Sequence, residues 1–241
     1  MKDTNTVSVV NIEADKQPLD FSLVLASSVH DMKNSLGMLL NTLEQVIADN
    51  PAQNEEQAQR FACLQYESSR INVELVQLLS IYRMQNDRMP IHIEEHYVID
   101  VLEEQLARNH MLFETRSIDV AIDCDEDLKG YFDAELVGGV VHNILVNCAR
   151  YSREKLSIVA SCSSGGLSIA ICDDGGGYPP SMLAAPTATN AGVSFSSGST
   201  NLGLFFAFEV AALHCINGIC GRIELANGGP LGGGVFTIYL P

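Results

Sequence analysis

The sequence predicts an α+β protein in which a long helical hairpin precedes a mixed α/β domain. Apolar residues follow a heptad spacing in two stretches, 25–46 and 61–82, as expected for two helices that each bury one seam. Beyond Pro90 the pattern changes to short alternating segments separated by apolar helical ones, which is typical of a sheet covered by helices. With 46% apolar and 18% charged residues, the 241-residue chain can form real hydrophobic cores.

The first predicted helix carries His30 on its solvent face. Val29 and Met32 occupy heptad positions a and d. The same register places His30 at b, Asp31 at c and Asn34 at f, so an imidazole, a carboxylate and a carboxamide share one exposed surface. A solvated or purely structural histidine is the alternative interpretation. The apolar seam of this helix comprises Leu25, Val29, Met32, Leu36, Leu39, Leu43 and Val46.

A turn at Asn50-Pro51 separates this helix from the second one. A hairpin of two helices cannot hide two apolar seams by itself, so we expect two copies to pair as a homodimeric four-helix bundle. The expected organisation is a polar tail at 1–20, a dimerising hairpin at 21–88 and an α/β domain at 89–241. The second seam comprises Phe61, Leu64, Ser68, Ile71, Leu75, Leu78 and Tyr82.

The elements of the α/β domain follow from changes in periodicity. Met89-Pro90 ends the second helix. Together the later segments predict a mixed sheet covered on one face by helices. Strands are expected at 91–94, 117–123, 156–161, 167–172, 221–225 and 235–240, and helices at 97–113, 134–151 and 201–215.

Composition excludes several classes of function. A net charge of −16 opposes binding to nucleic acid, which requires clustered Lys and Arg. The first 20 residues contain no secretory signal, and no apolar run reaches the length of a membrane span, so a cytosolic protein is expected. The seven cysteines lack zinc-ligand spacing and are interpreted as buried thiols in a reducing compartment. A redox switch at Cys148 or at the pair Cys215 and Cys220 stays open.

An acidic, glycine-rich turn follows the predicted strand at 167–172. Asp173 at a strand end can accept a hydrogen bond from an exocyclic amine. Gly175 and Gly177 allow the backbone to approach a ligand without obstruction by a Cβ atom. An ordinary Asp-Gly turn is the alternative.

The predicted helix at 134–151 carries Asn143 and Asn147 one turn apart, with Arg150 one further turn along the same face. Such a row can ligate hydrated Mg²⁺ through a carboxamide oxygen and contact phosphate oxygens. A polar helix face is the alternative, although Asn is a poor helix former. The opposite face is apolar and comprises Val140, Val141, Ile144, Leu145 and Val146.

A small polar turn, 198–204, enters the last predicted helix and includes Thr200, Leu202 and Gly203. The N–H groups at such a helix start can bind anionic oxygens, although Ser, Thr and Asn are also ordinary N-caps. The Ala-, Ser-, Thr- and Pro-rich segment between Tyr178 and Gly198 is long enough to act as a lid.

Taken in order, these segments resemble the transmitter core of bacterial sensor histidine kinases from about Phe21 to Pro241. The run 30–36 is similar to the H box, in which His30 would be the phosphoacceptor, Asp31 would assist it and Asn34 would help to dephosphorylate the partner. The runs 143–152, 173–177 and 198–204 are similar to the N, G1 and G2 boxes. The N box includes Tyr151 and implies Mg²⁺ on Asn147, whereas the G1 box implies adenine at Asp173.

The resemblance implies a dimeric helical hairpin followed by the Bergerat-type ATP-binding sandwich that gyrase and Hsp90-type ATPases share. Two departures from the family pattern stand out. Ser35 replaces the usual proline of the H box, so we expect a less kinked helix. Ser199 and Asn201 replace glycines of the G2 box, which favours an altered phosphate cradle.

The implied function is an ATP-dependent protein-histidine kinase that phosphorylates its own His30, with ATP and Mg²⁺ as cofactors. The phosphoryl group would pass to an aspartate of a response-regulator receiver domain, and input would come from a separate sensor protein or another source. One alternative is a histidine phosphotransfer protein with a degenerate catalytic domain that does not use ATP. Another is a sequestering protein related to anti-sigma kinases, which would leave the hairpin and His30 unexplained.

Overall fold

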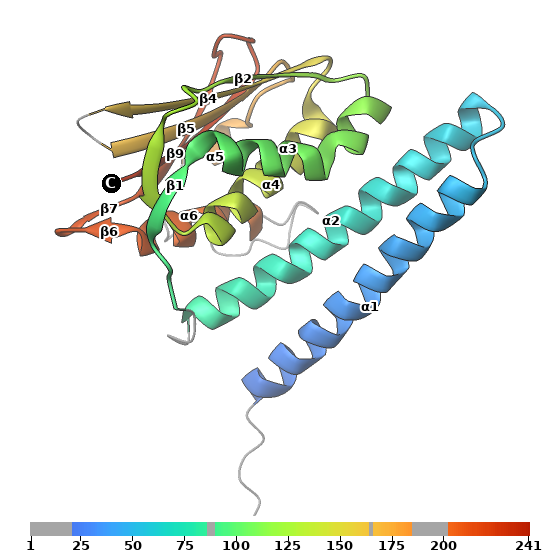
Figure 1. Ribbon diagram of the computed structural model, residues 1–241, viewed down its shortest axis with the longest axis horizontal. Coiled ribbons are helices and arrows are strands. Elements are labelled where there is room, and N and C mark those ends of the chain that lie inside the picture. The colour runs from blue at the N-terminus through green and yellow to red at the C-terminus, as the bar shows by residue number, and fades with distance from the viewer. Residues whose placement is uncertain (1–20, 86–89, 164–165, 185–201) are drawn as a thin grey trace, which may run out of the picture.

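The computed structural model describes residues 21–85, 90–163, 166–184 and 202–241, and it begins with an antiparallel pair of long helices (Figure 1). These are α1 (Phe21–Asp49) and α2 (Glu55–Gln85). The second helix begins where Asn54 Oδ1 accepts a hydrogen bond from the N–H of Gln57 at 2.8 Å, and Glu55 and Glu56 occupy its first turn. The predicted helical hairpin is confirmed.

Each heptad seam divides into a covered and an uncovered half. On α1, Val29 is only 4% exposed, and the later a-position residues Leu36 and Leu43 are half-buried. The d-position residues lie outside because one partner helix covers only one side of an apolar stripe. The six residues of this exposed stripe are Met32, Leu39 and Val46 on α1 and Leu64, Ile71 and Leu78 on α2, with exposures between 37% and 56%.

The second half of the chain contains a five-stranded mixed sheet with the strand order β2-β4-β5-β9-β8. Strands β2 and β4 pair in parallel, and the other neighbours are antiparallel. This confirms the predicted mixed sheet. The strands are β2 (Asp119–Asp123), β4 (Lys155–Ser163), β5 (Gly166–Asp173), β8 (Arg222–Asn227) and β9 (Gly234–Leu240).

A separate two-stranded ribbon pairs β1 (Glu94–Tyr97) with β3 (Lys129–Phe132). The sequence placed the first of these strands at 91–94, which was three residues too early. The cause is tertiary, because the N–H of His92 donates to Asp133 Oδ2 at 2.9 Å and not to a neighbouring strand. The short β3 was not predicted at all.

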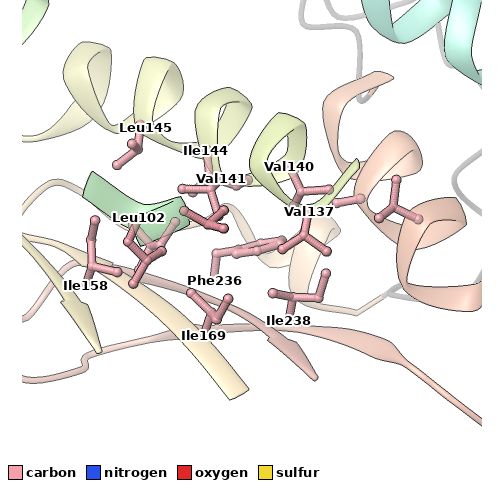
Figure 2. Packing of buried hydrophobic residues seen from close by; sticks show 14 of the residues in the cluster. Leu102, Val137, Val140, Val141, Ile144, Leu145, Ile158, Ile169, Phe236 and Ile238 are labelled. Carbon is pink, nitrogen blue, oxygen red and sulfur yellow. The ribbon is translucent and has the colours of Figure 1, made fainter. Parts of the chain in front are cut away.

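Three helices cover one face of the sheet: α3 (Val98–Thr115), α4 (Ala134–Tyr151) and α6 (Leu202–Leu213). The apolar face of α4 packs against the inner residues of the central strands, among them Ile158, Ile169 and Phe236 (Figure 2). Asp133 caps α4 by accepting a hydrogen bond from the N–H of Leu136 at 3.0 Å. Helix α6 is apolar all round because it lies between α4, the sheet and α2.

The hairpin packs against the α/β domain through α2, which contacts α6 and α3. Ile81 and Met84 of α2 belong to the main hydrophobic core. Tyr66 and Val73 of α2 form a smaller cluster with Val146 of α4. Val146 therefore faces the hairpin, in contrast to the rest of the apolar face of α4, which faces the sheet.

The cysteines depart from the expectation of uniformly buried thiols. Cys148 and Cys172 are buried as expected, whereas Cys63 and Cys162 are exposed. Cys215 and Cys220 are joined by a disulfide across the small hairpin of β6 (Cys215–Ile216) and β7 (Ile219–Cys220), which was not predicted. A turn at Asn217-Gly218 folds this segment back on itself and places the two cysteines opposite one another.

The short helix α5 (Pro180–Leu183) follows the glycine-rich turn and completes the elements of the described chain. Across the described ranges, none of the helices has both the length and the apolar composition that a bilayer crossing requires.

Candidate functional site

The three residues of the expected phosphoacceptor motif lie on α1. Asp31 and Asn34 are exposed, whereas only the backbone of His30 is described. Helix α1 continues through Ser35, whose hydroxyl donates to the carbonyl of Asp31 at 2.9 Å. A serine in place of the usual proline thus leaves the helix unbroken, because it retains the N–H that a proline lacks.

Asp173 lies at the end of β5, with its carboxylate held by backbone amides. Its Oδ1 atom accepts hydrogen bonds from the N–H groups of Gly175 at 2.7 Å and Gly234 at 3.1 Å. The residue is 9% exposed, so this carboxylate sits in a nearly closed recess. Two amide donors make the orientation of the carboxylate rigid, which suits an acceptor of a ligand's hydrogen bond.

The glycines around Asp173 permit close backbone approaches. A Cβ atom at Gly175 would collide with the carbonyl oxygen of Tyr151, and one at Gly233 would collide with Asp173 itself. The N–H of Gly233 also donates to the carbonyl of Asp173 at 3.0 Å. The turn between β8 and β9 therefore packs directly on the carboxylate. Sequence reasoning missed this partner, although the glycines at 228–234 were a visible signal.

Asp174 points away from Asp173 and has a structural role. Its carboxylate accepts hydrogen bonds from the backbone N–H groups of Arg153, Glu154 and Lys155 at 2.7, 3.0 and 3.1 Å, where β4 begins. Desolvation acts to raise the pKa of Asp174, but these hydrogen bonds outweigh it and lower the pKa below its usual value. The two adjacent carboxylates thus have different roles. Asp173 lies in the recess, whereas Asp174 stabilises the start of β4.

The glycine-rich turn is closed by two hydrogen bonds between Asn227 and the backbone of Tyr178, which together form a clamp. Asn227 Oδ1 accepts from the N–H of Tyr178 at 2.7 Å, and Asn227 Nδ2 donates to the carbonyl of Tyr178 at 2.9 Å. Gly177, with φ of +74°, adopts the left-handed conformation that this turn requires. The clamp fixes the turn from β8, which the sequence alone did not reveal.

Neutral groups surround the Asp173 carboxylate. Burial, together with the charge of Asp173, raises the pKa of the Cys148 and Cys172 thiols. The same causes, with burial the larger, raise the pKa of the Tyr178 phenol. These shifts favour the protonated, neutral forms of the three groups, and the Asp173 carboxylate lies among them.

The residues expected on one face of α4 divide into exposed and buried members. Asn147, Arg150 and Tyr151 are exposed, and the guanidinium carbon of Arg150 lies 5.3 Å from the centroid of the Tyr151 ring. Asn143 is only 6% exposed because the start of α6 covers it. A Cβ atom at Gly203 would collide with the Asn143 carboxamide. Asn143 and Asn147 thus lie one turn apart on α4, as the sequence indicated, but Asn143 is covered whereas Asn147 is open to solvent.

The buried Asn143 carboxamide also has an unused donor. Its Nδ2 atom lacks a hydrogen-bond partner among the residues that the structure describes. An orphaned donor of this kind is costly unless a ligand or water satisfies it. Leu202 and Gly203 begin α6 directly over it, whereas Ser199, Thr200 and Asn201 of the expected phosphate turn lie outside the described residues, as does the expected lid segment from 185 onward.

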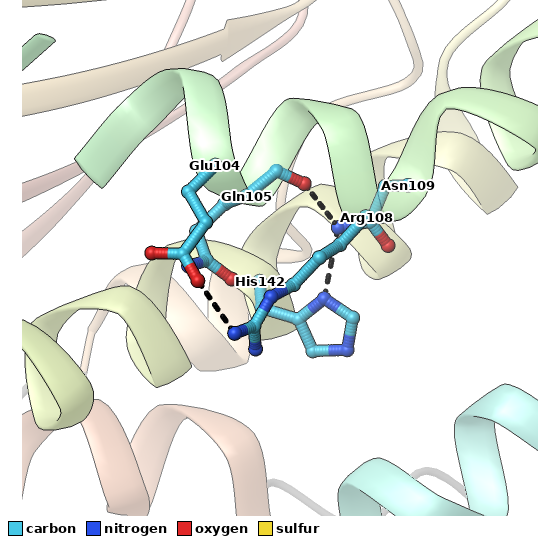
Figure 3. A network of polar contacts seen from close by, with 5 residues as sticks. All are labelled: Glu104, Gln105, Arg108, Asn109 and His142. Carbon is cyan, nitrogen blue, oxygen red and sulfur yellow. Dashed lines mark hydrogen bonds and ion pairs between the residues drawn. The ribbon is translucent and has the colours of Figure 1, made fainter. Parts of the chain in front are cut away.

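A second polar network fixes α4 against α3 (Figure 3). Asn109 Nδ2 donates to the carbonyl of Gln105 at 2.7 Å and lies 2.8 Å from His142 Nδ1. Arg108 pairs with Glu104 at 2.6 Å on the same face of α3. Burial lowers the pKa of His142, so the neutral imidazole accepts through Nδ1. This contact holds α4 in place next to Asn143.

Comparison with known proteins finds similarity to sensor kinases. No protein-family model matches the chain. The adaptive-response sensory kinase SasA of Crocosphaera subtropica is 24% identical over 185 residues, which cover 71% of this chain and 48% of SasA. The sensor histidine kinase GraS of Staphylococcus haemolyticus is 24% identical over 154 residues, which cover 64% of this chain and 42% of GraS. The chain thus spans about half the length of these relatives.

Solved structures show the same arrangement of a hairpin and an α/β domain. The histidine kinase AdeS of Acinetobacter baumannii matches with a TM-score of 0.56 and 20% identity, covering 88% of this chain and 96% of AdeS. Full-length ShkA matches with a TM-score of 0.61 and 16% identity, covering 91% of this chain and 46% of ShkA. The chain thus has the fold of histidine kinase transmitter cores, a DHp-type helical hairpin followed by a HATPase-type domain, and its similarity in sequence is to sensor kinases.

Proposed function

We propose that this chain is an ATP-dependent protein-histidine kinase that phosphorylates His30 and passes the phosphoryl group to an aspartate of a response-regulator receiver domain. The observation that carries the proposal is the Asp173 carboxylate, which two backbone amides hold rigid in a recess that is otherwise uncharged. An adenine offers the exocyclic N–H donor that such an acceptor selects. We assign Oδ2 of Asp173 as the atom that receives it.

The remaining residues of the expected nucleotide site receive roles from their positions. Gly175 and Gly177 form the turn beside the adenine, and Tyr151 lies against that turn through its carbonyl group. Asn143 would donate its unpartnered Nδ2 hydrogen to a phosphate oxygen. The turn at the start of α6, with Thr200, Leu202 and Gly203, would cradle the phosphates with backbone N–H groups.

Asn147 and Arg150 complete the part of the proposed nucleotide site that would contact the phosphates. Both are exposed one turn apart on α4, so a carboxamide oxygen and a guanidinium face the same solvent region. Within the described part of the chain, no cluster of three His, Cys, Asp or Glu side chains could hold a metal. The Asn147 carboxamide oxygen would hold Mg²⁺ together with the phosphate oxygens, and the ion would supply charge neutralisation when bound.

A related structure supports nucleotide binding by this fold. The full-length ShkA structure, which has a TM-score of 0.61 against this chain, is a complex with AMPPNP. AMPPNP is an analogue of ATP, and the orphaned Asn143 donor and the rigid Asp173 acceptor are suited to the two ends of such a molecule.

In the proposed reaction an imidazole nitrogen of His30 attacks the γ-phosphorus, the bond to the bridging oxygen breaks, and ADP departs with that oxygen. Asp31 would accept a hydrogen bond from the other ring nitrogen and raise the nucleophilicity of the attacking one. Asn34 lies one turn beyond His30 and would orient water for the reverse, phosphatase reaction. Exposure of Asp31 and Asn34 leaves room for a receiver domain.

The exposed stripe of six residues supports the proposed homodimer. Its members are spaced by seven along each helix, which is the repeat of a seam that packs against another helix. A second copy of the hairpin would cover it and complete a four-helix bundle. We accordingly assign 21–88 as the dimerisation and phosphoacceptor unit and 89–241 as the ATP-binding domain, working in the cytoplasm.

Charged substitutions in this stripe should separate the dimer. In the double variant Leu39→Glu/Ile71→Glu, the interface would have to bury two unpaired carboxylates from each copy, so we expect dimer dissociation to increase by about 100-fold or more. Analytical ultracentrifugation measures the change. Met111→Glu is the matched control, because Met111 is a similarly exposed apolar residue on α3. A wild-type chain that sediments as a monomer would contradict the proposed dimer.

The proposed activity is tested by incubating the purified chain with γ-labelled ATP and Mg²⁺. We expect the protein to become labelled and the label to be lost in acid but kept in alkali, as for a phosphoramidate. Acid-stable label would place the phosphoryl group on a hydroxyl and contradict the proposal. Absence of both label and ATP binding would favour a histidine phosphotransfer protein with a degenerate catalytic domain.

A further inference from the structure

The hairpin of β6 and β7 is built to place two cysteines face to face. Asn217 and Gly218 both have positive φ, 52° and 81°, as in a type I′ turn. Cys215 and Cys220 are register partners in this hairpin, with their α-carbons 4.0 Å apart. The turn and the strand register thus place the two sulfur atoms opposite one another.

Both cysteines of the disulfide are exposed residues at the surface. Cys215 and Cys220 are exposed, and so are Ile216 and Ile219 between them. Thiol–disulfide exchange requires a thiolate to approach one sulfur of the disulfide, and burial is the usual protection against it. This disulfide therefore lacks the shielding that makes a structural disulfide resistant to reduction.

The remaining cysteines indicate a reducing environment. All five are free, and two of them, Cys63 and Cys162, are exposed. Exposed free thiols are typical of proteins that are kept in reducing compartments, where a disulfide is usually transient, catalytic or redox-sensing. An exposed disulfide on a chain with exposed free thiols is thus expected to cycle between its two states.

We propose that Cys215 and Cys220 form a reversible redox site that exchanges with a low-molecular-weight thiol–disulfide couple such as glutathione. In the oxidising direction one cysteine thiolate attacks the small disulfide and releases one thiol. The second cysteine then attacks the mixed disulfide, forms the Cys215–Cys220 bond and releases another thiol. Two electrons pass from the protein to the small disulfide, and the reverse sequence consumes two thiols.

The hairpin directly follows α6, and His214 at its base connects it to the start of α4. His214 is 1% exposed and donates from Nδ1 to the carbonyl of Val210 at 2.7 Å, so Nε2 is the acceptor for the N–H of Asp133 at 3.0 Å. Asp133 is also the N-cap of α4. The carbonyl of His214 accepts from the N–H of Gly221 at 2.8 Å, which closes the base of the hairpin. Loss of the Cys215–Cys220 bond would first affect the backbone hydrogen bond at this base.

The test is a redox titration of the full chain in glutathione buffers of graded ratio, followed by rapid alkylation and mass spectrometry of the 215–220 peptide. We expect one reversible two-electron transition of this pair within the accessible range of ratios. Cys162→Ser is the matched control and should retain the transition, whereas Cys215→Ser should remove it. A disulfide that survives a large excess of reduced glutathione, or thiols that do not rejoin in oxidised glutathione, would overturn the proposal.

Amide hydrogen exchange gives a second readout that does not depend on nucleotide binding. Reduction should accelerate exchange of the Gly221 amide by about tenfold or more, because the crosslink no longer holds the hairpin closed above it. The Cys215→Ser/Cys220→Ser variant should match the reduced wild-type chain. Equal exchange in the oxidised and reduced forms would show that the pair does not control this hairpin.

Discussion

Replacing His30 with glutamine is expected to reduce phosphate incorporation from labelled ATP to background, a loss of at least about 100-fold. A glutamine side chain keeps a polar group of similar length on α1 but has no nucleophilic nitrogen, so the phosphoryl group would have no acceptor. Affinity for ATP should not change, because the residues proposed to bind ATP belong to the α/β domain and the α6 turn. Autoradiography at matched nucleotide occupancy measures the effect.

His110→Gln is the control for this substitution. His110 is an exposed histidine on α3 that pairs with Glu114 at 3.2 Å, so its loss removes an imidazole without touching the hairpin. Labelling should persist in this variant. Equal labelling of His30→Gln and the wild-type chain would remove His30 from the proposed mechanism and direct attention to another acceptor.

Replacing Asp173 with asparagine is expected to weaken ATP binding by about 10- to 100-fold, equivalent to roughly 1.4–2.8 kcal/mol. Asparagine can keep one oxygen for the N–H groups of Gly175 and Gly234, so the turn should stay folded. Its NH₂ group would then replace Oδ2 and oppose the exocyclic amine, which is another donor. Isothermal titration with ATP or a non-hydrolysable analogue measures the change.

Asp174→Asn separates this effect from a general loss of charge at the turn. Asp174 caps the backbone of 153–155 and faces away from the recess, so its substitution should lower the melting temperature and leave ATP affinity within about twofold of wild type. If Asp173→Asn binds ATP as tightly as the wild-type chain, the Gly175–Gly177 segment is only a turn, and the assignment of the adenine site fails.

The helices were easier to predict than the contacts between them. The helix at 134–151 was placed with its observed bounds, because its apolar face follows a local helical period. The strand expected at 91–94 was misplaced, and β3, β6 and β7 were missed, because short strands are defined by their partners. Likewise, the fixed orientation of Asp173 depends on Gly234, which is 61 residues away.

By itself, the sequence determined the heptad seams of the hairpin, the mixed sheet with helices on one face, and the order of the motifs that resemble those of histidine kinases. These properties are periodic or local, so they can be seen in one chain without coordinates. Only the tertiary structure decided that half of each seam stays exposed, that Gly203 covers Asn143, and that Cys215 meets Cys220. Each of these depends on which surfaces pack together, and packing joins residues whose spacing in the sequence carries no signal of contact.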